Sequence, residues 1–121
     1  MSDERSIPRF FDQAKPEQDT SEGTIEERIR AKGLTAPRLT PDDISNAIQQ
    51  IAFHVFPGTQ LTICCLTLKN GFYVVGHSAL ASPENYDAEL GRDIAFKRAR
   101  EQIWQLEGYL LKQQLYEESL A

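Results

Sequence analysis

The sequence is short of basic charge, of cysteine and of long apolar runs, and each shortage excludes a class of protein. The chain of 121 residues has 13 Lys and Arg against 18 Asp and Glu, which gives a formal charge of −5. Proteins that bind nucleic-acid backbones without sequence preference depend on Lys and Arg to neutralise phosphates. The charge therefore disfavours broad nucleic-acid binding.

No apolar stretch approaches the roughly 18 residues that span a bilayer, and no charged-then-apolar leader opens the chain. We therefore expect no membrane segment, and a protein that stays in the cytoplasm of the cell that makes it. The only cysteines, Cys64 and Cys65, are adjacent. Neighbouring side chains of a strand point to opposite faces, so we expect two unpaired, buried thiols in a reducing compartment.

The chain also lacks the motifs that carry common chemistries. It contains no GxxxxGK[ST], GxGxxG or HExxH, which removes support for nucleotide hydrolysis and zinc proteolysis. Cys64 and His77 are expected on one sheet face with His54 one helix away, but the paired spacings of zinc sites, such as CxxC, are missing. We therefore predict no metal, no cofactor and no catalytic residue, and hence no enzyme.

Composition divides the chain into an arm and a body. Residues 1–23, MSDERSIPRFFDQAKPEQDTSEG, are rich in Asp, Glu, Gln, Ser and Pro and have no period. This pattern predicts a flexible acidic arm, followed by a single compact domain over residues 24–121. Phe10 and Phe11 form an apolar group inside the arm, which could dock on the body of the protein or on a partner.

Two short helices are predicted at the start of the body. Thr24-Ile25-Glu26-Glu27 has the pattern of a capping box, which places the first helix start at Thr24. Thr40 is a good N-cap, with Pro41 at the first helical position. Apolar residues at helical spacing then predict a second helix that continues to Pro57-Gly58; they are Ile44, Ile48, Ile51 and Val55.

A β-hairpin is the strongest local signal. Asn70-Gly71 lies between two β-branched and aromatic runs, which is typical of a two-residue type I′ turn. That turn predicts the pairs Leu68–Tyr73, Leu66–Val75 and Cys64–His77. Both faces of the hairpin are then largely apolar, so we expect something to cover each of them.

The segment SPENYDAELGRDIA, residues 82–95, opens the last helix and allows two interpretations. Ser82-Pro83-Glu84 favours a helix from Pro83 to about Leu115. Alternatively, Asn85 and Tyr86 belong to an irregular turn before a helix that begins near Asp87. Free amides at that turn, with Arg92 one turn along, would then form an anion or ligand contact. The cap signature favours the first interpretation.

The last helix has more apolar surface than one sheet contact needs. Gly91, Ala95 and Ala99 form a ridge of small residues, where another backbone could approach closely, and Trp104 lies on a neighbouring face. Gly91 and Gly108 each cost about 1 kcal/mol relative to Ala inside a helix, so we expect close packing at both. The surplus surface predicts a homodimer, the commonest way to bury it.

These signals together predict an α+β fold. It has two short amino-terminal helices, an antiparallel β-hairpin, alone or with a third strand, and a long carboxy-terminal helix packed on the sheet.

Four blocks of the sequence in order resemble the gene 49/gene 66 family of small tailed-phage and prophage proteins; they are IRAKGLTAPRLTPDDI, LTICCLTLKNGFYVVGHSA, SPENYDAELGRDIA and IWQLEGYLL. The resemblance covers residues 24–115 and implies a phage origin and the cytoplasm of a bacterial host. It implies no activity, cofactor or catalytic residue.

The favoured function is therefore that of a non-enzymatic phage accessory protein. It would bind a host or phage macromolecule in a host-takeover or counter-defence role, through Phe10, Phe11 and Trp104. An alternative is a DNA-binding regulator of winged helix-turn-helix type, with Asn70-Gly71 at the wing tip. Asp42 and Asp43 in the expected recognition helix speak against it. A small-nucleotide-binding protein is the third possibility.

Overall fold

The computed structural model describes residues 21–121, which divide into two units after Pro37. The first unit contains α2 (Glu22–Ala31), whose N-cap is Ser21. The backbone N–H of Thr24 donates to the Ser21 hydroxyl. The predicted helix start at Thr24 is wrong, because Ser21 is an equally good cap one turn earlier. Phe10 and Phe11 lie outside the described residues.

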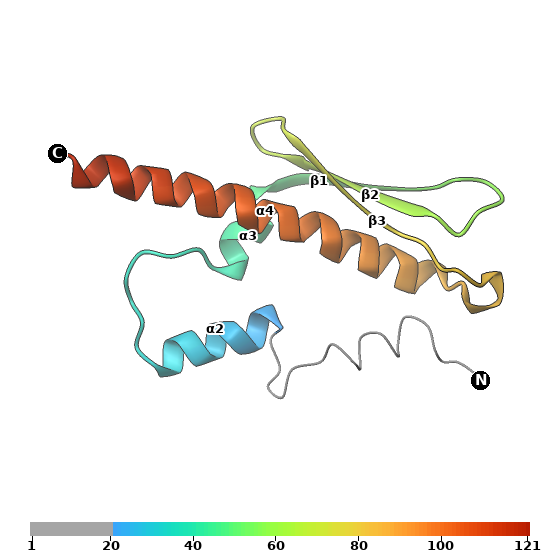
Figure 1. The fold of residues 1–121 in the computed structure, drawn as a ribbon, viewed down its shortest axis with the longest axis horizontal. Helices are drawn as coiled ribbons and strands as arrows, with labels where there is room; N and C mark the ends of the chain where they lie inside the picture. Colours follow the sequence, from blue (N-terminus) through green and yellow to red (C-terminus); the bar gives the residue numbers. More distant parts are fainter. Residues whose placement is uncertain (1–20) are drawn as a thin grey trace. The chain divides into compact units, whose positions relative to one another are not determined.

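The second unit, residues 38–121, contains a three-stranded sheet and a long helix (Figure 1). Its elements in order are α3 (Pro41–Ala47), β1 (Ile48–Val55), β2 (Thr62–Leu68), β3 (Tyr73–Ser78), the 3-10 turn η1 (Pro83–Asn85) and α4 (Ala88–Ser119). The strands are antiparallel in the order β1-β2-β3. The predicted α+β fold is confirmed, including the third strand. Among residues 21–121, no helix has the length and apolarity to cross a membrane.

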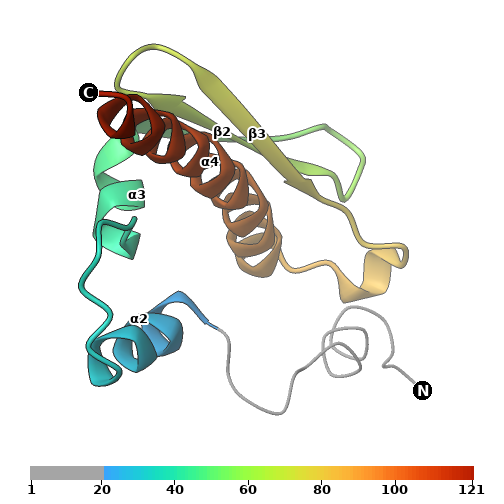
Figure 2. The ribbon, with the colours of Figure 1, turned by 60° about the vertical axis from the view of Figure 1, so that its left-hand side comes forward.

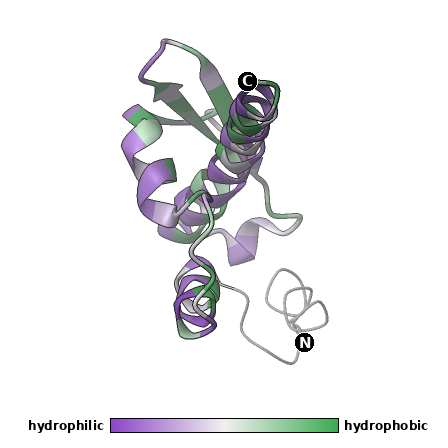
Figure 3. Cartoon of the chain, turned by 90° about the vertical axis from the view of Figure 1, so that its left-hand side faces the viewer, coloured by the Kyte–Doolittle hydropathy of each residue, from purple (hydrophilic) through white to green (hydrophobic). Residues whose placement is uncertain are grey.

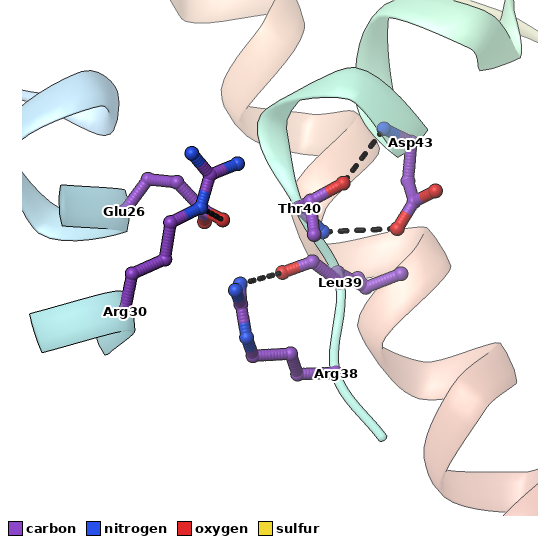
Figure 4. Close-up of polar contacts among 6 residues, drawn as sticks. All are labelled: Glu26, Arg30, Arg38, Leu39, Thr40 and Asp43. Carbon is purple, nitrogen blue, oxygen red and sulfur yellow. Dashed lines mark hydrogen bonds and ion pairs between the residues drawn. The ribbon is translucent and has the colours of Figure 1, made fainter. Parts of the chain in front are cut away.

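Helix α3 begins as predicted and ends much earlier. Figure 4 shows the reciprocal cap, in which Asp43 N donates to Thr40 Oγ1 over 3.2 Å and Thr40 N donates to Asp43 Oδ2 over 3.0 Å. The prediction that the helix continues to Pro57 is wrong, because residues from Ile48 onward pair with β2. The spacing of Ile51 and Val55 fits a helix, but this stretch is also β-branched and aromatic, and the strand ladder decides between the two.

The hairpin between β2 and β3 has a three-residue loop instead of the predicted two-residue turn. Gly71 N donates to Leu68 O, and Leu68 N donates to Phe72 O, each over 2.8 Å. Gly71 has a φ of 90°, so the loop is a β-turn that ends in a left-handed residue. The three predicted cross-strand pairs are therefore wrong by one residue, and the true partner of Tyr73 is Thr67. A shift of one residue moves every β3 side chain to the opposite face.

The long helix begins at Ala88, so the favoured start at Pro83 is wrong and the alternative start is observed. Pro83–Asn85 forms a separate 3-10 turn, and the Ser82 side chain makes no cap. Asp87 is the N-cap, and its Oδ1 accepts from Leu90 N over 3.0 Å. Asp87 caps the helix and Ser82 does not, because the Asp87 carboxylate accepts from a backbone amide in the first turn of α4, which has no partner within the helix.

Close contact between α4 and the sheet defines the core. A Cβ atom on Gly76 of β3 would overlap the backbones of Ala95 and Ala99, so only glycine fits there. Gly91 lies against Thr62, and Ser78 Oγ donates to Gly91 O over 2.8 Å. The ridge of small residues therefore packs on the sheet of its own chain. Figure 2 shows α4 lying along the sheet. The larger buried side chains around it are Ile44, Cys64, Leu66, Leu68, Val74 and Ile103.

The close contact predicts opposite effects for two glycine substitutions. Gly76→Ala should lower the free energy of unfolding by about 3 kcal/mol or more, because the obstructing atoms belong to backbone and cannot move aside cheaply. Gly108→Ala should raise it by about 0.5–1 kcal/mol, because Gly108 is inside α4 and its added Cβ meets only Leu39 Cδ1, at 4.0 Å. The expectation of close packing at Gly108 was wrong. Urea denaturation of both variants checks the signs, and a stable Gly76→Ala protein would contradict the packing described here.

Candidate functional site

The sheet face opposite α4, called the outer face below, follows from the strand register. Val75 is paired with Cys65, and Cys65 with Ala52, so their side chains lie on the same face. Cys64, Leu66 and Leu68 alternate with Cys65 along β2 and are buried against α4. Successive side chains of a strand point to opposite faces, so Cys65, Ala52 and Val75 point away from α4. The side chains of the outer face are Gln50, Ala52, His54, Ile63, Cys65, Thr67, Tyr73, Val75 and His77.

The outer face is uncharged, mixes apolar with polar side chains, and is exposed along β1 and β3. Tyr73 is 63% exposed and Val75 is 46% exposed. Figures 1 and 2 show α4 on the other side of the sheet, and no helix of residues 38–121 covers the outer face. The face contains no Lys, Arg, Asp or Glu. The expectation that something covers both faces of the hairpin is therefore not met within this unit.

The edge of the sheet at β1 is open as well. Ala52 and His54 pair with β2 through their backbone groups, and the bond from Phe56 N to Leu61 O continues this ladder. Backbone groups of successive residues point to opposite sides of a strand. The N–H and C=O groups of Ile51, Phe53 and Val55 therefore point outward, where no described residue pairs with them. Their side chains, which lie on the α4 side of the sheet, are 48%, 41% and 37% exposed.

The opposite edge, at β3, is covered by side chains of α4. By the same alternation, the carbonyls of Val75 and His77 point away from β2. Arg98 Nη1 donates to His77 O over 2.9 Å, and Gln102 Nε2 donates to Val75 O. Arg98 and Gln102 are one helical turn apart and so follow the edge of the strand. One edge of this sheet is protected from pairing with another strand and the other is not.

The segment around η1 contains the residues predicted to form an anion or ligand contact. Asn85 is exposed, Tyr86 is partly buried and Arg92 is exposed. Asp87 occupies the amide position where an anion would bind, through its bond to Leu90 N. Glu84 Oε1 accepts from Ser82 Oγ over 2.5 Å, and this bond lowers the pKa of Glu84. The carboxylate of Asp87 therefore lies at the amino terminus of α4, where the helix dipole favours negative charge.

The three candidate metal ligands are divided between the faces. Cys64 is paired with Gly76 and is buried on the α4 side, whereas His77 is paired with Ile63 on the outer face. The predicted pairing of Cys64 with His77 is therefore wrong. His54 lies on the outer face, edge-on to Phe56 with ring centroids 4.7 Å apart. Within the described part of the chain, no three His, Cys, Asp or Glu residues are placed to hold a metal ion.

A shallow hollow of about 410 Å³ lies where α3, the β2–β3 hairpin and α4 meet. Asp43 and Glu107 contribute acidic side chains, and Lys69 contributes one basic side chain. Asp43 is already used in the cap of α3. Asn46 and Asn70 add amide groups that can donate, but the two carboxylates and the single cation make the lining unfavourable for a nucleotide phosphate.

Comparison with known proteins agrees with the resemblance noted in the sequence. Residues 39–115 match the model of the phage protein (N4 Gp49/phage Sf6 gene 66) family, more than half of the chain. The chain belongs to this family. The match begins at Leu39, so residues 24–38, which the resemblance included, lie outside it. No curated protein and no solved structure matches the chain.

The family match contains α3, the whole sheet and α4 up to Leu115, so both the outer face and the β1 edge lie inside the shared region. The winged helix-turn-helix alternative finds little support there. Helix α3 has seven residues and runs directly into β1, so the expected recognition helix is replaced by a strand. Arg38 Nη1 donates to Leu39 O over 3.4 Å, and Arg30 Nε lies 3.3 Å from Glu26 Oε2.

In this phage protein Trp104 packs against the core and is only partly exposed. The residues that sequence reasoning missed are Ile51, Phe53 and Val55 of the open edge, because they were assigned to a helix. Their alternation with Ala52 and His54 has the period of a strand and was the available signal. Figure 3 shows hydrophobic stretches along the strands of this unit.

The two thiols of this family member should differ in chemistry. Burial, and next the neighbouring Cys65, raise the pKa of Cys64 from 9.0 to about 11. At pH 8.5 iodoacetamide should label Cys65 and leave Cys64 unmodified until the protein unfolds. Between about pH 9 and 11, Cys64 loses its proton in the unfolded state but keeps it in the folded state. The free energy of unfolding should therefore fall by about 2–3 kcal/mol as the pH rises through this range.

Cys64→Ala should remove that part of the pH dependence, and Cys65→Ala should keep it. Denaturation of the two variants side by side cancels the Tyr and Lys groups that titrate in the same range. Equal slopes in both variants would contradict the assignment to Cys64.

Proposed function

We propose that this phage protein acts by binding another protein through the outer face of its sheet, as a non-enzymatic accessory factor in the bacterial host. The observation that carries the proposal is the one-sided packing of the sheet. Helix α4 covers one face, while Tyr73 and Val75 on the other are largely exposed. Exposed aromatic and aliphatic groups that lie together typically mark a binding surface.

The chemistry of the outer face favours a protein over other partners. It lacks the Lys and Arg side chains that bind nucleic-acid phosphates. Tyr73 has an apolar ring and a hydroxyl that can donate and accept, a combination that is enriched at protein interfaces. The two histidines, His54 and His77, add polar groups at the borders of the face.

The arm around Phe10 and Phe11 remains a second candidate contact. A short apolar group in an acidic segment can fold onto a partner when the rest of the interface is in place. We therefore assign the outer face the main role and the arm an auxiliary one. Trp104 is packed on the core and is expected to support the fold of α4 more than to contact the partner.

A pull-down from host lysate with matched variants tests the proposal. Tyr73→Lys with Val75→Lys should reduce recovery of a specific partner at least tenfold, because two charges would be buried at the interface. Tyr109→Lys with Leu110→Lys makes a similar change on α4, where both residues are exposed, and should leave recovery unchanged. Removal of residues 1–20 should weaken recovery less than the outer-face change does.

Recovery that is lost only in the α4 variant would move the binding site to that helix. Failure of wild-type protein to recover any specific partner from host lysate or from phage-infected cells would count against a binding role. Circular dichroism of each variant separates loss of binding from loss of fold.

A further inference from the structure

We propose that two copies of this chain join at the β1 edge, in an antiparallel pair around a two-fold axis at Phe53, to form one six-stranded sheet. The order would be β3-β2-β1 continued by β1, β2 and β3 of the second copy. This inference depends on the edge of the sheet and does not require the proposed function of the outer face.

The two edges of the sheet are not equivalent. At β3, Arg98 and Gln102 donate to the outward carbonyls and occupy the positions that another strand would need. At β1, the outward N–H and C=O groups of Ile51, Phe53 and Val55 have no partner among residues 21–121. A second copy can therefore add its strand at β1 and not at β3.

Strand β1 also lacks the features that keep open edges apart. Its sequence, IQQIAFHV, contains no Lys, Arg, Asp, Glu or Pro over eight residues. Edge strands of monomeric proteins are usually short or carry inward charges or proline. The single bulge lies at its beginning, between Ile48 and Gln50, and leaves the segment from Ile51 to Val55 regular.

The strand is complementary to itself in one register. The residues whose backbone groups point outward are Ile51, Phe53 and Val55. A two-fold axis at Phe53 therefore places Phe53 opposite the partner's Phe53, and Ile51 opposite the partner's Val55. Aromatic and β-branched pairs stabilise antiparallel strands, and no like charges meet. The strand therefore adds no like-charge contact to the repulsion between two chains that each have a net charge of −5.

The same arrangement covers exposed apolar side chains. A two-fold axis perpendicular to the sheet keeps both α4 helices on one face. Ile51, Phe53 and Val55, which are 37–48% exposed on that face, would meet the same residues of the second copy in the space between the two helices. A foreign strand could satisfy the backbone groups but would have to supply a matching apolar set of its own. The second copy supplies that set by symmetry.

Light scattering on the full chain is the first test. The measured mass should be twice 13.7 kDa at micromolar concentration. A mass of one chain at every concentration would overturn the proposal. Removal of residues 1–20 should leave the dimer in place; a monomer that dimerises only after this removal would show that the amino-terminal segment occupies the edge, and would overturn the proposal for the full chain.

Charge exchange at Phe53 tests the axis. Phe53→Lys and Phe53→Glu should each weaken the dimer at least tenfold, because like charges would meet across the axis. An equimolar mixture of the two should recover a mixed dimer. Phe72→Lys makes the same change at an exposed Phe of the hairpin tip, and its dimer should match the wild type.

A wild-type dimer that both Phe53 variants leave intact would place the interface elsewhere and overturn the proposal. Weakening without recovery in the mixture would overturn the two-fold register at Phe53. Circular dichroism shows that each variant is folded. The pair Tyr73→Lys with Val75→Lys should keep the dimer mass, so failure of the dimer and failure of the outer-face proposal are separate results.

Discussion

The close approach of α4 to β3 at Gly76 is the contact on which the arrangement of the whole unit depends. Because no side chain separates the strand from the backbones of Ala95 and Ala99, the helix axis lies over β2 and β3. The position of the helix then decides which apolar side chains are buried. Those of β2 and β3 that face α4 form the core, while those of β1 extend beyond its cover.

The same contact explains why the two edges of the sheet differ. A helix that lies close to β3 brings long polar side chains within reach of that strand, and Arg98 and Gln102 satisfy its outward carbonyls. On the β1 side, Arg100 of α4 donates to Pro41 O and Ser45 Oγ of α3. The close approach that Gly76 allows thus places α4 where its side chains protect the β3 edge and leave the β1 edge open. The dimer proposed above depends on that open edge.

Local signals in the sequence identified most of the elements but few of their boundaries. The cap at Thr40 and the positive φ required at Gly71 follow from chemistry within four residues, so they were predictable. The start of α4 was not, because Ser82 and Asp87 are both good caps five residues apart. The strand β1 was missed for a similar reason, since Ile48, Ile51 and Val55 satisfy a helical period while Ile51, Phe53 and Val55 satisfy a strand period.

The sequence by itself determined the fold class, the long carboxy-terminal helix, the hairpin and the family to which the chain belongs. It also placed Gly91, Ala95 and Ala99 in one ridge, because residues four apart share a helix face. Only the tertiary structure decided what that ridge meets, which face each β3 side chain takes, and that β1 is a strand with a free edge. Those outcomes depend on pairing between segments distant in the sequence, where a register shift of one residue exchanges the two faces of a sheet.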